Sequence, residues 1–191
     1  MSGAQRDGRA ERILELATRL GALKFGDFTL SSGKKSRYYF DGRLLSLNPE
    51  GLYEIAEAFL PRVRKAGAKA IGGPTLGADP IVGGVVLLSG QRGEGIGGFL
   101  VRSQAKQHGT GQLIEGGLKA GTSVAVVDDT VSTGGNLIQA IEAAEAAGCR
   151  VVKVLAVLDR HQGGSDELRR RGYDFEALLE ATSDGQIAPM G

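Results

Sequence analysis

Residues 124–136 have the sequence Val-Ala-Val-Val-Asp-Asp-Thr-Val-Ser-Thr-Gly-Gly-Asn, in which four small apolar residues precede two acids and a loop of hydroxyls and glycines. The apolar run is typical of a strand that is buried on both faces of a parallel sheet. The glycines allow a tight loop, and the apolar spacing from Leu137 to Ala147 predicts a helix directly after it. Because backbone N–H groups at a helix N-terminus attract anions, we expect this loop to bind a phosphate group.

The two acids at the end of this strand require a different ligand. Asp128 and Asp129 lie beside the expected phosphate, and carboxylates repel an anion of their own charge. Carboxylates accept hydrogen bonds from hydroxyl groups and also hold metal-bound water. A phosphorylated sugar satisfies both the loop and the acids. The alternative, a role in capping the next helix, does not require the sequence Ser-Thr-Gly-Gly as well.

On both sides of this motif the chain alternates between apolar strands and amphipathic helices. This alternation predicts an α/β fold with a central parallel sheet flanked by helices. In such sheets ligands bind at the carboxyl ends of the strands, where Gly73, Asp128 and Asp159 are expected to emerge. Strands are predicted at residues 70–71, 96–101, 123–127 and 151–158 and near 113–114, with helices at 79–88, 137–147 and 166–171.

Four further segments lie outside this alternation. The apolar spacing predicts packing helices through residues 13–20 and 52–63, and Pro61 is expected to kink or shorten the second. Residues 28–41 place aromatic residues after a basic turn at a spacing that does not suit a helix, which indicates a hairpin outside the main sheet. Residues 104–111 are almost wholly polar, so we expect a mobile hairpin loop there.

The composition is typical of one soluble domain, which we expect to span residues 1–191. Lys and Arg total 23 against 22 Asp and Glu, and a net charge of +1 gives no general attraction to nucleic acid or to an anionic membrane. The single cysteine, Cys149, excludes an intrachain disulfide, and we find no apolar segment typical of a signal peptide or a membrane span. We therefore expect a cytoplasmic protein with no nucleic-acid and no membrane partner.

The motif at residues 124–136 resembles the phosphoribosyl diphosphate (PRPP) binding motif of type I phosphoribosyltransferases. Further segments resemble orotate phosphoribosyltransferases in the order of that family. They are a hood at about residues 20–45 that includes Phe28 to Asp41, a pyrophosphate loop at 73–78, a flexible flap with Arg102, Lys106, His108 and Gly109, the segment 114–116, and Asp159-Arg160 with Gly163-Gly164. The resemblance covers about residues 13–175 and implies the type I phosphoribosyltransferase fold.

The resemblance implies transfer of ribose 5-phosphate from PRPP to orotate, giving orotidine 5′-monophosphate and pyrophosphate in de novo pyrimidine biosynthesis. It implies Mg²⁺, held through PRPP and waters near Asp128 and Asp129 rather than directly by the protein, and a homodimer with shared active sites. It assigns catalysis to Lys106, His108, Asp128 and Asp129; PRPP binding to these four and to Arg102, Thr130, Val131, Ser132, Thr133, Gly134 and Gly135; pyrophosphate binding to Thr75, Leu76 and Gly77; and orotate binding to Ser132, Arg160, Tyr38 and Tyr39.

Several of these roles have plainer alternatives. Lys106 and His108 also suit solvated positions on a loop, and Arg160 suits a strand cap that pairs with Asp159. The two tyrosines suit packing in the hood as well as contact with the base.

Two other functions also suit the motif. A purine or xanthine phosphoribosyltransferase is the nearer one, because many orotate enzymes carry lysine where this chain has Ser31, Gly77 and Ser103. A PRPP-sensing regulatory protein of the same fold would need a basic surface for nucleic acid, and the near-neutral charge argues against it.

Overall fold

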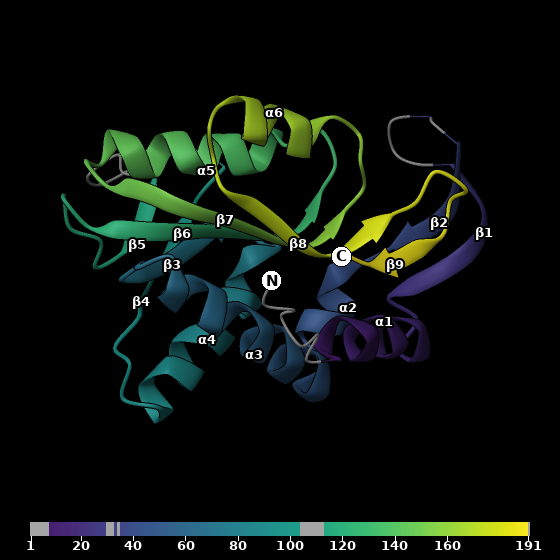
Figure 1. The fold of residues 1–191 in the computed structure, drawn as a ribbon, viewed down its shortest axis with the longest axis horizontal. Coiled ribbons are helices and arrows are strands. Elements are labelled where there is room, and N and C mark those ends of the chain that lie inside the picture. Colours follow the sequence, from purple (N-terminus) through teal and green to yellow (C-terminus); the bar gives the residue numbers. More distant parts are fainter. Residues whose placement is uncertain (1–7, 30–32, 34, 104–112, 191) are drawn as a thin grey trace, which may run out of the picture.

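The computed structural model describes residues 8–29, 33, 35–103 and 113–190 (Figure 1). Strands and helices alternate through most of this part of the chain, as the apolar pattern predicts. The elements are α1 (Arg9–Arg19), β1 (Leu23–Thr29), β2 (Lys35–Phe40), α2 (Gly42–Ser46), α3 (Pro49–Lys65), β3 (Ala70–Pro74), α4 (Ala78–Gln91), β4 (Gly97–Val101), β5 (Ile114–Gly116), β6 (Ser123–Val131), α5 (Gly135–Ala146), β7 (Arg150–Asp159), α6 (Gly164–Arg170), β8 (Phe175–Ala181) and β9 (Ile187–Pro189).

The central sheet has the strand order β5-β4-β3-β6-β7-β8-β9. Strands β4, β3, β6, β7 and β8 run parallel, and β5 and β9 pair antiparallel at the two edges. From β3 the chain proceeds to β4 on one side, whereas from β6 it proceeds to β7 on the other. The carboxyl ends of β3 and β6 therefore flank the switch point, where ligands bind in open α/β sheets.

Helices cover both faces of this sheet (Figure 1). Helices α3 and α4 lie on one face with α1 and α2 beside them, and α5 and α6 lie on the other. The apolar core is divided accordingly, since Ala125 and Val127 of β6 pack in the cluster that includes α3 and α4. Val124 and Val126 pack in the cluster that includes α5. All four side chains are buried, so the prediction of a strand buried on both faces is confirmed.

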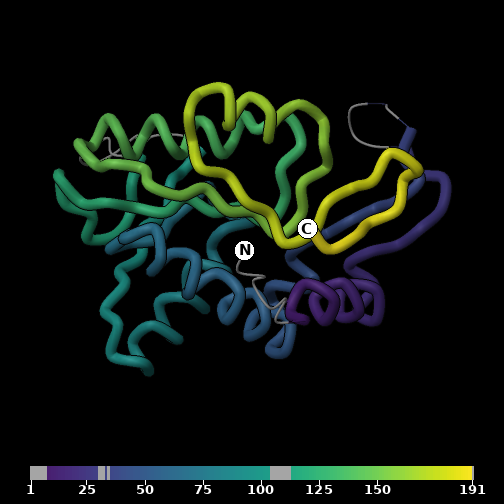
Figure 2. Tube along the Cα trace, in the orientation of Figure 1, coloured from purple at the N-terminus to yellow at the C-terminus, as the bar shows by residue number. Residues whose placement is uncertain are grey.

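Strands β1 and β2 form a separate two-stranded antiparallel sheet, which we call the hood. Tyr38 and Phe40 alternate with exposed residues along β2 and are buried in the same cluster as α1 and α3. At its other side β2 lies beside the turn between β8 and β9 (Figure 2). The Arg37 side chain lies against Gly185 of this turn. The hood is thus fixed beside the C-terminal strands, as a hairpin outside the main sheet.

Some element boundaries differ from the sequence prediction. Strand β6 continues through both acids to Val131, because Thr130 and Val131 still pair with β7. Helix α3 continues past Pro61 to Lys65, so the proline does not shorten it. Helix α2 and strands β8 and β9 were not predicted, since each is short or close to an edge. No helix of the described residues is long and apolar enough to cross a membrane.

Candidate active site

A cavity of about 630 Å³ opens at the switch point of the sheet. Its walls come from four segments that are far apart in the sequence: the end of the hood, the loop after β3, the end of β6 with the loop that follows, and the residue after β7. Its lining residues are Tyr39, Phe40, Asp41, Gly42, Arg43, Pro74, Thr75, Leu76, Gly77, Asp128, Asp129, Thr130, Val131, Ser132, Thr133, Gly134, Gly135, Asn136, Leu137 and Arg160. The volume suits a phosphorylated sugar together with a small base.

Residues 130–135 line the cavity and are called the phosphate loop below; they comprise the end of β6, the turn that follows and the first residue of α5. Gly134 precedes α5 with φ 83°, a left-handed conformation that glycine adopts without steric cost. Its carbonyl accepts the first hydrogen bond of the helix, from Ile138 N–H at 2.9 Å. The loop thus meets the positive end of a helix dipole, which favours an anion.

The phosphate loop rests on the start of α6. Gly164 N–H donates to the Ser132 carbonyl at 3.0 Å. A Cβ on Gly164 would lie 2.6 Å from the backbone nitrogen of Gly134 and 2.7 Å from the Ser132 oxygen. Only a glycine permits this approach without displacing the loop, so the Gly163-Gly164 motif supports the phosphate loop from behind.

The two acids lie at the top of β6, with their carboxylates close together. Asp128 is 6% exposed, and its Oδ1 accepts a hydrogen bond from Asp129 N–H at 2.9 Å. Burial and the neighbouring Asp129 raise the pKa of Asp128 to about 8. Burial also raises the pKa of Asp129, against the lowering effect of the Arg43 charge. Two ionised carboxylates are unfavourable in this site when no ligand is bound. The site therefore favours ligands that donate hydrogen bonds or carry positive charge.

Two glycines from different elements enclose these acids. A Cβ on Gly42 would lie 2.7 Å from the Asp129 carboxylate, and a Cβ on Gly77 would lie 2.7 Å from Asp128 Oδ1. Any larger residue at either position would force the acids to move. This gives a steric reason for glycine at position 77.

The predicted pyrophosphate loop forms one rim of the cavity. Thr75, Leu76 and Gly77 all line it, and the Thr75–Leu76 peptide bond is cis. Thr75 N–H donates to the Val101 carbonyl at 3.0 Å, which continues the pairing of β3 with β4 beyond the last strand residue. Leu76 lines the cavity, and its side chain is largely exposed.

The hood supplies a wall that the sequence prediction identified only in part. Tyr39 lines the cavity and contacts the Phe28 ring, with 5.8 Å between ring centroids. Four further lining residues at the end of β2 and the start of α2 were not predicted as site residues, namely Phe40, Asp41, Gly42 and Arg43. Asp41 caps α2 by accepting from Arg43 N–H at 3.1 Å, and the Arg43 side chain holds the pKa of Asp41 below its usual range. The signal in the sequence was an acid followed by Gly-Arg directly after the hairpin.

Of the two predicted orotate-binding residues Arg160 and Tyr38, only Arg160 lines the cavity. Arg160 lines the cavity beside the phosphate loop, and its N–H donates to the Val131 carbonyl at 2.8 Å. Asp159 Oδ1 instead accepts from His161 N–H at 2.8 Å, and within the described chain no ion pair joins Asp159 to Arg160. Tyr38 is not among the lining residues, whereas its neighbours Tyr39 and Phe40 are.

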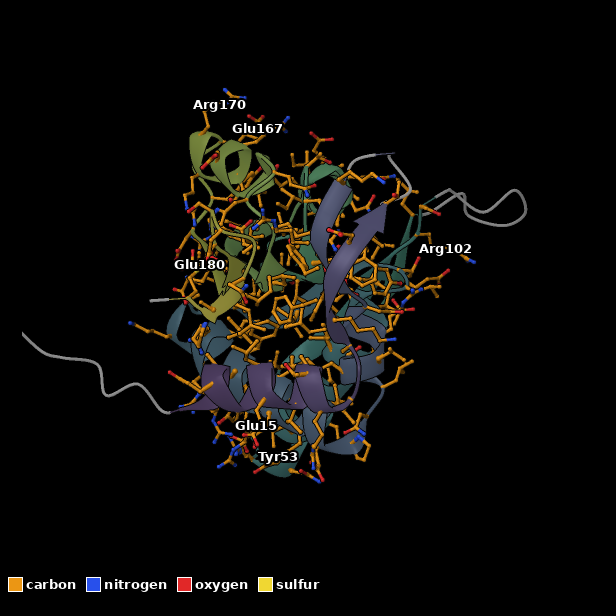
Figure 3. The ribbon with its side chains drawn as sticks, turned by 90° about the vertical axis from the view of Figure 1, so that its right-hand side faces the viewer. Glu15, Tyr53, Arg102, Glu167, Arg170 and Glu180 are labelled. Carbon is orange, nitrogen blue, oxygen red and sulfur yellow. The ribbon has the colours of Figure 1, made fainter. Side chains whose placement is uncertain are left out.

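The remaining predicted residues lie at or beyond the edge of the cavity. Arg102 pairs with Glu115 at 2.9 Å and projects from the periphery of the molecule (Figure 3). It lines a small neighbouring cavity of about 90 Å³ together with Thr75. Lys106 and His108 fall outside the described residues, as does Ser31.

The sequence model of the phosphoribosyl transferase domain family matches residues 95–187 of this chain, which include β6, the phosphate loop and Arg160. Fold and site thus define the class: a phosphoribosyltransferase. The chain is 40% identical over 163 residues to the orotate phosphoribosyltransferase of Rhodopirellula baltica, covering 82% of this chain and 84% of that protein. More narrowly, therefore, the chain belongs to the orotate phosphoribosyltransferase family.

Solved structures agree with this assignment. The orotate phosphoribosyltransferase of Mycobacterium tuberculosis H37Rv matches with a TM-score of 0.77 at 35% identity, over 90% of this chain and 95% of that one. The structure of that enzyme in complex with PRPP matches with a TM-score of 0.74 at 32% identity, over the same 90% and 95%. The family and the fold predicted from the sequence motifs are thereby confirmed.

Proposed function

We propose that this protein transfers the 5-phosphoribosyl group of PRPP to orotate, producing orotidine 5′-monophosphate and pyrophosphate for pyrimidine biosynthesis. The observation that carries the proposal is one cavity lined by a phosphate loop, the buried Asp128 with its neighbour Asp129, and Arg160. Its relatives are named for this activity, and one of them is known in complex with PRPP.

The 5′-phosphate of PRPP is assigned to the phosphate loop, Thr130 to Gly135. Backbone N–H groups at the start of α5 and the hydroxyls of Thr130, Ser132 and Thr133 supply hydrogen-bond donors. The ribose 2- and 3-hydroxyls are assigned to Asp128 and Asp129. A hydroxyl that donates to a buried carboxylate replaces part of the hydration that the carboxylate lost on folding.

The reaction exchanges one bond at C1 of the ribose. The bond from C1 to the pyrophosphate oxygen breaks and its electron pair leaves with pyrophosphate, while N1 of orotate forms the new bond to C1 and loses its proton to solvent. Positive charge develops on the sugar, as in glycoside transfer. The protein's contribution is to align N1 with C1, to stabilise the departing negative charge and to exclude water.

The residues of the site fit Mg²⁺ that is held mainly by the substrate. Asp128 and Asp129 are adjacent acids at the cavity, and among the described residues there is no group of three or more Asp, Glu, His or Cys side chains that could enclose a metal ion. Mg²⁺ retains several waters and prefers phosphate oxygens, so these two acids would hold it through its waters. When bound, it supplies positive charge to the leaving diphosphate.

The base is assigned to the space between the hood and Arg160. A guanidinium group can bind a carboxylate through two parallel hydrogen bonds, which suits the carboxylate of orotate. Tyr39 and Ser132 line the same cavity. Aromatic surface on one side and a hydroxyl on the other suit a flat, polar ring.

We also infer that Lys106 and His108 approach the pyrophosphate from the flap, with Arg102 at its base, and that two chains share their sites in a cytoplasmic homodimer. The family resemblance supports these inferences. The dimer is also supported by the apolar side chains of Leu44 and Leu47, which are about half and three-quarters exposed near the hood.

The experiment is a comparison of acceptors. The protein is incubated with PRPP, Mg²⁺ and one base at a time, and pyrophosphate release is followed with orotate, hypoxanthine, guanine and xanthine. We expect release with orotate that stops when Mg²⁺ is chelated. Turnover with a purine and none with orotate would overturn the proposal in favour of a purine enzyme, and no turnover with any base would favour a PRPP sensor.

A further inference from the structure

Arg160 borders two cavities. The first is the candidate active site. The second, of about 620 Å³, lies between β2, the segment after β7 and the end of β8. Tyr38 lines this second cavity and is not among the residues lining the first. Its ring therefore lies on the side of Arg160 that faces away from the site assigned to the substrates.

The Tyr38 ring is in contact with the Arg160 guanidinium. Arg160 Cζ lies 5.3 Å from the ring centroid, within the range of about 6 Å for a cation–π interaction. The ring is a fixed platform, since Tyr38 is 6% exposed. Its backbone is also held, because Ser36 Oγ donates to the Tyr38 carbonyl at 2.6 Å and accepts from Tyr38 N–H at 3.3 Å. Burial raises the pKa of Tyr38, so its hydroxyl stays neutral.

Arg160 is otherwise sparsely held by protein. Its buried Nε has no hydrogen-bond partner in the described part of the chain. The neighbouring Asp159 is directed elsewhere, toward His161, whose Nε2 lies 2.9 Å from Glu180. Arg160 thus keeps its Nε–H without a partner among the described residues, while the ring and the hydroxyl of Tyr38 hold the guanidinium in place.

We propose that Tyr38 is a positioning residue, which holds Arg160 ready for the acceptor's carboxylate and so sets the preference for a carboxylated pyrimidine. The inference rests on the proposed function. An arginine side chain loses much rotamer freedom when it binds a ligand, and a ring that already restricts it lowers that cost. A guanidinium group forms two parallel hydrogen bonds with a carboxylate only when its plane is correctly oriented. Tyr38 should therefore increase the affinity for ligands that carry the carboxylate and not for ligands that lack it.

The test measures binding of two nucleotides that differ only in that carboxylate. Orotidine 5′-monophosphate carries it and uridine 5′-monophosphate does not, and both can use the phosphate loop. Dissociation constants are measured by calorimetry for the wild type, Tyr38→Leu and Tyr38→Phe. We expect Tyr38→Leu to raise the dissociation constant of orotidine 5′-monophosphate about tenfold and to change that of uridine 5′-monophosphate by no more than about twofold. Tyr38→Phe keeps the ring and should retain most of the preference.

The chain offers a matched control and a reference variant. Phe175 lies under Arg169 with 5.2 Å from Cζ to the ring centroid, and Phe175→Leu removes an equally buried ring from a strand remote from the site. It should leave both dissociation constants unchanged. Arg160→Ala should abolish the preference, and adding Tyr38→Leu to it should have no further effect on the preference.

The outcomes separate the two claims. Suppose that Arg160→Ala weakens the binding of orotidine 5′-monophosphate alone. If Tyr38→Leu then weakens the binding of both nucleotides equally, or of neither, the positioning role is wrong and the proposed function stands. If Arg160→Ala leaves the preference intact, Arg160 does not bind the carboxylate and the inference is overturned. A wild-type protein without any preference would contradict the proposed function itself.

Discussion

Replacing Asp128 by asparagine should stabilise the unliganded protein near neutral pH while it lowers the catalytic rate at least a hundredfold. Asp128 is buried beside Asp129, and burial followed by that neighbour raises its pKa to about 8. In the unfolded chain its pKa is about 3.9. Between these two values the folded state keeps a proton that the unfolded state has lost, so the stability of the wild type falls as the pH rises from about 4 to about 8.

The size of the effect follows from the pKa difference. For each pH unit in this interval, the free energy of unfolding of the wild type falls by about 1.4 kcal/mol relative to that of a variant that does not titrate at this position. From about pH 5 to about pH 7.5, the stability of Asp128→Asn relative to the wild type should therefore rise by about 3 kcal/mol. With a urea dependence of about 2 kcal/mol/M, the difference between their unfolding midpoints should change by about 1.5 M.

The assay is urea unfolding of both proteins at several pH values, without ligand or divalent cation. Pyrophosphate release by the variant is measured in parallel and should fall at least a hundredfold, about 3 kcal/mol in transition-state stabilisation. A stability difference that is constant across this pH range, or that falls with rising pH, would show that folding does not raise the pKa of Asp128.

Three further predictions follow from the same site. Gly164→Ala should raise the KM for PRPP at least tenfold, because its Cβ would displace the phosphate loop, whereas Gly83→Ala, which has open space for a Cβ, should leave kinetics unchanged in a steady-state assay. Gly42→Ala should lower kcat by displacing the acid beside it, and circular dichroism should show an intact fold. Lys106→Ala and Asp129→Ala should each be nearly inactive, yet mixing with subunit exchange should restore activity toward about a quarter of all sites; no recovery after verified exchange would mean that each flap closes over its own chain.

The sequence was sufficient to predict the centre of the molecule. Residues 124–127 are small and apolar, and all except Ala125 are β-branched. Such residues suit a strand covered on both faces, which is where the structure places them. The loop and helix after Val131 followed from glycines and apolar spacing, which act locally. The acids, the phosphate loop and the pyrophosphate loop could be placed together because strand ends in a parallel sheet meet at one edge.

The walls of the site contributed by the hood were harder to predict, because they depend on packing between distant segments. Tyr38 and Tyr39 are adjacent in the sequence, but alternation along β2 places one under Arg160 and the other beside the cavity. Nothing local distinguishes the two residues. The place of Asp41 to Arg43 depends on a five-residue helix, too short to show an apolar period.

The proposed transfer from PRPP to orotate is tested most directly by identifying the products of one reaction. The protein is incubated with PRPP, orotate and Mg²⁺, and orotidine 5′-monophosphate and pyrophosphate are quantified together by mass spectrometry, for the wild type and for Asp129→Asn. We expect equal amounts of the two products with the wild type. We expect Asp129→Asn to lose at least a hundredfold in rate, a barrier increase of about 3 kcal/mol. Pyrophosphate formed without orotidine 5′-monophosphate, or an undiminished rate in the variant, would contradict the proposal.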